Sequence, residues 1–357
     1  MATKCFQEKF WLLACFFVPL CPDSYNWLDI NMNEKINKTL KSSETEDWLD
    51  YHFIRPLCYY LSVFFAKLDV HPNTVTILSM IVGAASTVFF ASGCFYYEGI
   101  TGLVMNLIAI AMLMVADLLD CTDGQLARMT GKKSRLGRIL DGMAGFVWFV
   151  PIYCGLVWRF YQHHDLEFSW LGIVDTEQNV LIATAIVFVL ALISGFQGIS
   201  GQQRLADYYI QVHLFFLKGE KGSELDNSKK QQDIYDKMGP ETPFYERTFQ
   251  KSYIDYTRKQ EKSTPEFQRL MAKLKEKYGS TDNIPADVRE EIHRHSLAIM
   301  PWNGMLTFNF RSAFLFLFCL LDVPVMYFLW EIIGMGLLTL YVNRRHEAFC
   351  KRIADGL

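Results

Sequence analysis

Long apolar runs separated by short polar segments are the feature that most constrains how this chain can fold. The clearest runs cover residues 100–119 and 179–198, and each matches the roughly 20 residues that an α-helix needs to cross a bilayer. Inside a bilayer the backbone has no water to bond to, so such runs form helices in which backbone groups bond to one another. The sequence therefore predicts an all-α, polytopic membrane protein, and its 51% hydrophobic and 20% charged composition agrees with that class.

Six transmembrane helices account for the apolar runs. The last apolar block, residues 308–342, is too long for one helix and contains Asp322 and Pro324, so we divide it there into the fifth and sixth helices. The first four helices are expected near residues 71–92, 100–119, 136–159 and 179–198.

The segment before the first helix, residues 47–69, mixes seven aromatic side chains with charged residues such as Arg55 and Lys67. This mixture predicts an amphipathic helix that lies in the membrane interface and is interrupted near Pro56.

Residues 1–46 are expected to form an N-terminal tail. Its apolar stretch, residues 10–20, is too short to span a bilayer and imitates a signal peptide, but the cleavage pattern after it is poor. The reading that we favour is that residues 1–31 are absent from the mature protein and that Met32 is the true start.

A polar segment, residues 218–304, separates the fourth and fifth helices and is expected to be a helical insert. Pro265 marks the start of one helix and Gly279 its end, and a second helix is expected from Ala286 to about His295. The insert has too few apolar residues for a core of its own, so its helices should pack against the membrane domain. No metal is expected at His293 and His295, because side chains two apart on a helix point in different directions.

The insert divides the chain into a first membrane part, residues 70–217, and a second part, residues 305–357, that holds the last two helices and a tail. Lys and Arg concentrate in the loop between the second and third helices, in the insert and after residue 342, whereas residues 162–178 have none. Basic loops stay on the cytoplasmic side of a membrane. We therefore expect an integral, multi-pass protein with both termini and the loop after the second helix on the cytoplasmic side.

Three carboxylates, Asp120, Asp123 and Asp141, stand where the second helix ends and the third begins. Residues 120–128 read DCTDGQLAR, and residues 137–145 read GRILDGMAG. Residues three and four apart are neighbours on a helix face, so these carboxylates gather on facing surfaces. Such a group of hard oxygen ligands repels itself unless a cation lies within it, and it suits Mg²⁺ or Mn²⁺ better than zinc.

Small residues and cations accompany the carboxylates. Gly124 and Ala127 leave the acidic face bare, so a ligand can approach the backbone. Cations for the phosphates of such a ligand are supplied by Arg128, Lys132, Lys133, Arg135 and Arg138.

This stretch, residues 120–145, resembles the signature of the CDP-alcohol phosphotransferase (CDP-alcohol phosphatidyltransferase) family, D-x-x-D-G-x-x-A-R, eight residues, G-x-x-x-D-x-x-x-D. Every position matches except the last, where Gly145 replaces the fourth Asp. Pro72, Asn73 and Thr76 also match the Pro-Asn-x-x-Thr that the family commonly has before it. The resemblance implies a transferase that moves a phosphatidyl or phosphoalcohol group from a CDP-linked donor to a hydroxyl acceptor and releases CMP.

The resemblance also implies roles for individual residues. The metal ligands would be Asp120, Asp123 and Asp141, with Asp141 also catalytic. The CDP-linked donor would lie against Gly124, Ala127, Arg128 and Ser134, although Ser134 is equally suited to cap the third helix. The acceptor would meet Gln203 and Arg204, the alternative for Arg204 being a snorkelling side chain at the interface.

Gly145 stands where the family places its general base, so another group must take the acceptor's proton. Asp117 lies one turn before Asp120 on the same face and is the candidate, the alternative being a structural Asp inside an apolar helix. Two further functional classes stay open: a catalytically impaired relative that acts as a partner or scaffold, and a multipass cation transporter.

The expected partners are the bilayer, a CDP-linked donor, and lipid and polar-alcohol substrates, with a second copy of the chain as a further candidate. The basic loop and Arg204 favour a phosphorylated polyol, such as inositol phosphate or glycerol phosphate, as the soluble substrate. No nucleic-acid partner is expected, since the net charge of -3 does not point to one.

Overall fold

The computed structural model describes residues 42–46, 50–132 and 134–357, and those residues contain helices and no β-strand. Within them, six helical stretches are long and apolar enough to cross a membrane: Pro72–Ser92, Ile100–Thr130, Leu140–Gln162, Glu177–Gln197, Ala286–Leu320 and Pro324–Gly356. The predicted fold class, an all-α polytopic membrane protein with six spans, is confirmed. The expectation for residues 1–31 lies outside the described residues.

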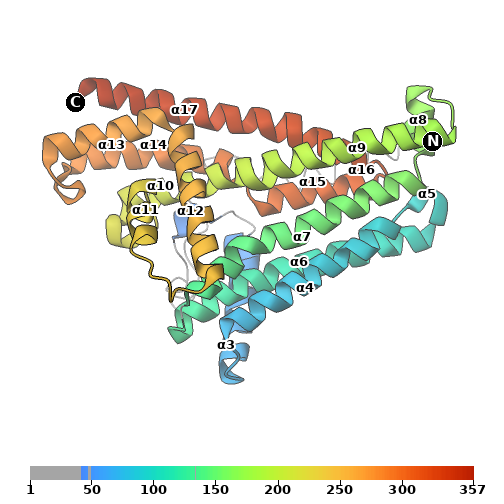
Figure 1. Cartoon of the computed structure of the whole chain (residues 1–357), viewed down its shortest axis with the longest axis horizontal. Helices are drawn as coiled ribbons and strands as arrows, with labels where there is room; N and C mark the ends of the chain where they lie inside the picture. The colour runs from blue at the N-terminus through green and yellow to red at the C-terminus, as the bar shows by residue number, and fades with distance from the viewer. Residues whose placement is uncertain (1–41, 47–49, 133) are drawn as a thin grey trace.

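The first half of the bundle is built around α4 (Pro72–Ser92), which packs against both α6 (Ile100–Thr130) and α7 (Arg135–Gln162). Next in the chain, α9 (Glu177–Gln197) packs along α7. Figure 1 shows these helices running along the long axis together with α17 (Met335–Gly356), while the short helices α5 (Phe95–Glu98) and α8 (Asp165–Leu171) lie at one end of the bundle.

Small residues let α4 and α7 approach closely. Ser79, Gly83 and Ser86 follow one another at helical spacing on the buried face of α4. A methyl group on Gly83 would lie 2.2 Å from the indole of Trp148 on α7, and that indole donates a hydrogen bond of 3.1 Å to the carbonyl of Ser79. Such stripes of small residues allow helices to pack through van der Waals contact where no hydrophobic effect drives them together.

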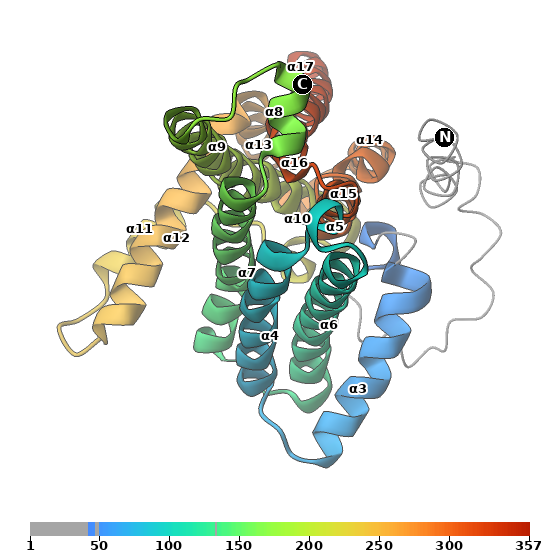
Figure 2. The same ribbon diagram turned by 90° about the vertical axis from the view of Figure 1, so that its right-hand side faces the viewer.

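The amphipathic helix before α4 is present as α3 (Arg55–Lys67), preceded by the π-turn η3 (Asp50–Ile54). Pro56 lies in the first turn of α3, where a missing N–H costs nothing, so the expected interruption becomes the start of the regular helix. Ser62 on the inner face donates a 3.0 Å hydrogen bond to the carbonyl of Thr122 on α6. The outer face carries exposed Phe53, Leu57, Tyr60, Phe64 and Leu68. Figure 2 shows α3 alongside α6 at the edge of the bundle.

Four helices form the insert: α11 (Ser228–Asp236), α12 (Phe244–Ser263), α13 (Pro265–Tyr278) and α14 (Ala286–Gly304). The expected start at Pro265 and end at Gly279, which has a φ of +74°, are confirmed. Helix α14 is longer than expected, because Leu297, Ile299 and Met300 continue its apolar content past His295.

The insert has no separate core of its own. Helices α13 and α14 share one hydrophobic cluster with α10 (Gln203–Lys218) and α17, in which Leu270, Leu274, Ile299, Phe216 and Cys350 are buried. The expectation that these helices pack against the membrane helices, for want of enough apolar residues, agrees with this shared cluster.

The last apolar block divides where the sequence indicates, into α15 (Phe308–Leu320) and a second helical stretch. That stretch consists of α16 (Pro324–Leu329), the π-turn η7 (Trp330–Gly334) and α17. A buried ion pair of 2.7 Å joins Arg311 on α15 to Glu331 in η7. Glu331 also accepts hydrogen bonds from Tyr153 on α7 and Ser194 on α9, so one carboxylate links four helical segments.

A second buried ion pair lies at the opposite end of α6 from the acidic signature. Arg159 on α7, only 2% exposed at its side chain, contacts Asp322 at 2.6 Å and Asn106 at 3.0 Å. Asp322 also accepts hydrogen bonds of 2.9 Å from the backbone N–H groups of Phe95 and Tyr96 at the start of α5. Asp322 therefore joins the α15–α16 connection to both α5 and α7.

We expect Asp322→Asn to destabilise the protein strongly. Asn keeps the shape and an oxygen acceptor and tolerates the positive φ of 59° at this position, but it leaves Arg159 buried without an opposite charge, which costs about 3–5 kcal/mol. The apparent melting temperature in detergent, followed by size-exclusion chromatography, should fall clearly.

The matched control is Asp175→Asn, at the same end of the bundle. Asp175 is 62% exposed at its side chain and contacts only His164 among the ion pairs of the described residues, at 3.3 Å. Exposed pairs of this kind contribute about 1 kcal/mol or less, so this variant should melt like the parent. Equal melting temperatures for the two variants would contradict the role given to Asp322.

Candidate active site

Helix α6 continues without a break through the acidic signature, so Asp117, Asp120 and Asp123 project from one rigid element. The sequence predicts a membrane helix ending near residue 119, but the structure extends it to Thr130, where Gly131 adopts a left-handed φ of +69° and ends it. Helix α7 then starts after only four residues and runs antiparallel to α6 (Figure 2), with Asp141 in its second turn.

The four aspartates form one electrostatic group. Asp120 interacts with Asp117, Asp123 and Asp141, and Asp123 interacts with Asp141 across the two helices. Asp123 is only 5% exposed, Asp120 is half-buried and Asp141 is exposed. The structure therefore places the three expected metal ligands and Asp117 within electrostatic range of one another, and Asp141 is the most exposed of the four.

The carboxylate oxygens are suited to holding a cation. Oδ1 of Asp120 and Oδ2 of Asp123 are buried and have no hydrogen-bond partner among the described residues. A buried, unpartnered carboxylate oxygen is costly, and a bound divalent cation relieves both that cost and the repulsion between the charges. Asp120, Asp123 and Asp141 thus fit Mg²⁺ or Mn²⁺ as the sequence predicts. Thr76 on α4 lies close to Asp123, and its hydroxyl donates a 3.2 Å hydrogen bond to the carbonyl of Pro72.

The small residues of the signature make room for an arginine. A methyl group on Gly124 would lie 3.4 Å from Nη1 of Arg128, so the guanidinium folds back over the bare glycine. Arg128 interacts with Asp141 across the helix pair. Ala127, on the same stretch of α6, is half-buried.

The start of α7 is fixed against α4. Ser134 caps α7, because its Oγ accepts a 2.9 Å hydrogen bond from the N–H of Gly137. The same hydroxyl donates to Oδ1 of Asn73, at 3.2 Å. These contacts agree with the capping alternative for Ser134 and place Asn73 where it sets the position of the helix that carries Asp141.

Sequence reasoning missed a second charged group beside the carboxylates. Arg55, on α3, donates a 2.8 Å hydrogen bond to Glu46, interacts with Asp50 and also lies near Asp117 and Asp120. The only signal for it was a lone arginine among aromatic residues, and interfacial helices often carry such residues without a function. The interfacial helix thus contributes a guanidinium to the edge of the site.

Burial raises the pKa of both Glu46 and Asp50, while the neighbouring Arg55 opposes that rise. For Arg55, burial disfavours the charge, but Cys121, Glu46 and Asp50 together hold its pKa above the ordinary value. Arg55 is therefore a permanent cation that lies beside Glu46 and Asp50 and within electrostatic range of Arg128.

Gly145 faces open space at the place where the family has an aspartate. A methyl group there would have only the amide of Gln203 within 4 Å, at 3.8 Å from its oxygen. The structure therefore brings the expected acceptor residue Gln203 next to the position of the replaced Asp. Gln203 begins α10, directly after the π-turn η4 (Gly198–Gln202).

Arg204 faces away from Gly145 toward a different surface. It is half-buried, interacts with Tyr256 on α12, and burial lowers its pKa. With Gln202, Leu205 and Gly336 it lines a groove of about 360 Å³ between η4–α10 and η7–α17. The four aspartates do not line this groove, so we base the site on the carboxylates rather than on the groove.

Residues 69–195 match the family model described as CDP-alcohol phosphatidyltransferase. The matched segment runs from the turn before α4 to near the end of α9 and contains the four aspartates, Arg128 and Gly145. The resemblance drawn from the signature is thereby confirmed. No curated protein matches the chain.

We expect Gly137→Ala to destabilise the protein, because the added methyl group would lie 2.6 Å from Oδ1 of Asn73 and 3.0 Å from Oγ of Ser134. Overpacking of this kind costs about 1–3 kcal/mol. The control, Gly142→Ala, adds a methyl group on the same helix with nothing within 4 Å and should gain up to about 1 kcal/mol from helix propensity. A melting temperature above that of the parent in both Gly137→Ala and Gly142→Ala would contradict the close contact between α4 and α7.

Proposed function

Since residues 69–195 form a CDP-alcohol phosphatidyltransferase domain, we propose that this protein is a membrane enzyme of phospholipid synthesis. It transfers a phosphatidyl or phosphoalcohol group from a CDP-linked donor to a hydroxyl acceptor and releases CMP. The observation that carries the proposal is the convergence of Asp120, Asp123 and Asp141, with buried and unpartnered oxygens on the first two.

In this proposal Asp120, Asp123 and Asp141 would hold a divalent cation. A divalent cation such as Mg²⁺ or Mn²⁺ bound there supplies positive charge that offsets the negative charge of the pyrophosphate and of the leaving CMP. Arg128, folded over Gly124, adds a guanidinium that binds a phosphate oxygen. Gly124 and Ala127 let the nucleotide lie against the helix, and Ser134 contributes by capping α7 and fixing Asp141.

The acceptor hydroxyl attacks phosphorus in line with the bond to CMP; that bond breaks, and the hydroxyl proton passes to a base. We assign the base to Asp117, because it belongs to the same electrostatic group and Gly145 has no carboxylate to offer. Gln203, beside Gly145, binds the acceptor. Asp117 also lies near Arg55, whose charge helps to orient it.

Two further features support a phosphorylated polyol, of the inositol phosphate or glycerol phosphate type, as acceptor, and CDP-diacylglycerol as donor. Arg55 and Arg128 both lie beside the carboxylates, and two guanidinium groups suit two phosphate-bearing substrates. The exposed aromatic face of α3 supports entry of the lipid from the bilayer near this edge. The distribution of Lys and Arg supports a cytoplasmic location for the site.

We expect Asp123→Asn to reduce transfer to background, because it removes one charged ligand without changing size. The assay is CMP release by the purified full chain in lipid–detergent micelles with CDP-diacylglycerol, polyol phosphates and Mg²⁺ or Mn²⁺, with the lipid product identified by mass spectrometry. Asp175→Asn, at the far end of the bundle, is the control and should work like the parent. Substantial activity in Asp123→Asn would refute the assignment, and absence of CMP release by the parent with every donor would favour the scaffold alternative.

A second prediction addresses the base. Asp117→Asn should slow transfer by on the order of 10²-fold or more, the usual scale for loss of a general base. Gly145→Asp introduced into that variant should recover part of the rate, because it restores a carboxylate at a position where an added Cβ has only the amide of Gln203 within 4 Å.

Gly145→Asn is the matched control for that recovery, since it has the shape of Asp without the charge. Equal rates for Gly145→Asp and Gly145→Asn in the Asp117→Asn background would show that the position no longer serves as a base. Unchanged turnover in Asp117→Asn alone would exclude Asp117 from the role.

A further inference from the structure

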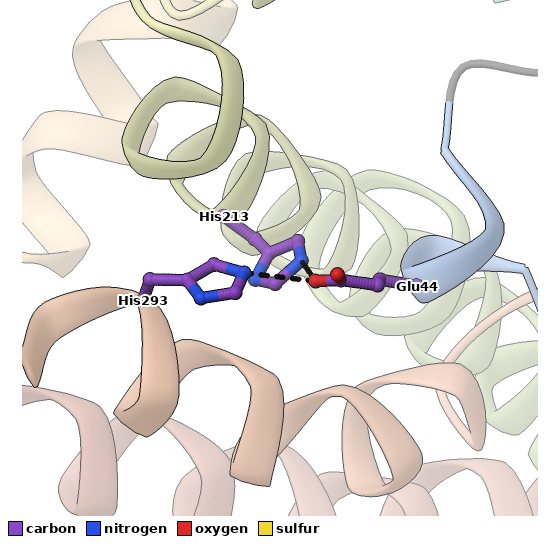
Figure 3. A group of neighbouring side chains, drawn as sticks. All are labelled: Glu44, His213 and His293. Carbon is purple, nitrogen blue, oxygen red and sulfur yellow. Dashed lines mark hydrogen bonds and ion pairs between the residues drawn. The ribbon is translucent and has the colours of Figure 1, made fainter. Parts of the chain in front are cut away.

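Glu44, His213 and His293 meet at a point that none of the family motifs covers. They come from three elements far apart in the chain: the short helix η2 (Ser43–Thr45), α10 and α14. Figure 3 shows the two imidazole rings and the carboxylate directed at one another between these elements. The expectation that His293 is an exposed histidine is wrong: its side chain is 21% exposed and contacts Glu44.

The geometry of the cluster is that of a three-ligand metal site. One oxygen of Glu44, Oε2, lies 2.8 Å from Nε2 of His293 and 3.0 Å from Nε2 of His213. One ligand atom from each residue lies within 4.8 Å of the other two. In a tetrahedral site with bonds of about 2.0–2.1 Å, ligand atoms stand about 3.3 Å apart. The two distances to Glu44 would lengthen by a few tenths of an ångström to admit the ion, and the two histidine nitrogens already lie within 4.8 Å of each other.

The hydrogen bonds around His213 direct a lone pair into the cluster. Ser296 donates its only hydroxyl proton to the carbonyl of His293, at 2.8 Å. Its oxygen also lies 2.8 Å from Nδ1 of His213, so with the hydroxyl proton on the His293 carbonyl it accepts a hydrogen bond from that nitrogen. A neutral His213 then carries its proton on Nδ1 and presents the bare Nε2 to Glu44.

That arrangement places two acceptors 3.0 Å apart around a fully buried ring. A cation between Nε2 of His213 and the carboxylate of Glu44 would be coordinated by both acceptors and would remove their repulsion. Metal-binding histidines regularly make a hydrogen bond through their other ring nitrogen, as His213 does with Ser296.

We propose that Glu44, His213 and His293 bind a divalent transition-metal ion of the zinc class, with a fourth position left for water. Two imidazoles and one carboxylate suit zinc, whereas the all-carboxylate group on α6 and α7 suits Mg²⁺ or Mn²⁺. The chain thus has two chemically distinct metal sites made from different residues.

A second grouping of possible ligands does not support a site in the same way. His346, Glu347 and Cys350 lie together on α17, but Glu347 accepts a 2.7 Å hydrogen bond from the backbone N–H of Glu266. That carboxylate caps the start of α13, and the group is embedded in the hydrophobic cluster that α13 and α17 share. Among the described residues, the Glu44 cluster is therefore the better candidate.

The bound ion would fasten the segment before α3 to two later helices. Glu44 is the ligand from that segment, and Glu46, two residues on, contacts Arg55 beside the carboxylates. By holding Glu44 against α10 and α14, the ion would fix the position of Glu46. The role is structural, because the cluster is formed by residues other than those of the proposed reaction.

The test measures zinc in the purified full chain by inductively coupled plasma mass spectrometry after exchange into zinc-containing, then zinc-free, buffer. We expect about one zinc per chain, and less than about a tenth of that in Glu44→Gln and in His293→Asn. Ser296→Ala should keep the ligands but weaken zinc binding by roughly 10- to 100-fold. Size-exclusion profiles in detergent show whether each variant is folded.

Two variants serve as controls. His295→Asn removes a histidine of the same helix whose ring instead stacks on Phe349 at 3.7 Å, and Asp123→Asn removes a carboxylate of the other site; both should retain zinc. X-ray absorption at the zinc edge of the unmodified chain, which needs no variant, should show two imidazole ligands. Zinc that persists in folded His293→Asn, that leaves in Asp123→Asn, or that never binds the parent chain would overturn the proposal.

Discussion

Mutual repulsion between carboxylates is the constraint on which the rest of this structure depends. Asp120, Asp123 and Asp141 stay together only because α6 and α7 are held rigidly against a common neighbour, α4. Close packing supplies that rigidity: Gly83 admits the indole of Trp148, and the start of α7 bonds to α4 beside Gly137. A bulkier interface would separate the two acidic faces, so the small residues matter to the chemistry although they touch no substrate.

The second half of the chain holds the first half in place from outside. Two buried ion pairs make this attachment. Glu331, paired with Arg311, accepts hydrogen bonds from α7 and α9, and Asp322 pairs with Arg159 on α7. Each is buried, so removing one partner would leave a charge without compensation. At the other end, α10, α13, α14 and α17 share one hydrophobic cluster. The matched family segment, residues 69–195, is therefore only part of the folded unit.

The sequence predicted most of the membrane architecture because each signal for it is local. The break at Asp322 and Pro324, and the helix from Pro265 to Gly279, were readable from residues within one or two turns. Contacts between distant segments were not readable. No residue near Arg55 in the sequence indicates that it lies within electrostatic range of Asp120, and no sequence spacing relates Glu44 to His213. Both relations depend on how whole helices pack. The three carboxylates of the signature could be predicted from the sequence because they lie within 26 consecutive residues, 120–145.

Two neighbouring helical stretches each contain one π-turn, η4 before α10 and η7 before α17, and Gln202 of the first bonds to the carbonyl of Glu331 in the second. A π-turn holds one residue more than an α-turn, and one residue corresponds to a rotation of about 100° around the helix axis. The two turns thus determine which side chains of α10 and of α17 point in a given direction around the helix axis. Deleting a single residue from η4 would rotate Gln203 away from Gly145 without changing the hydropathy of the preceding span, so the length of this turn determines which side chain of α10 lies beside Gly145.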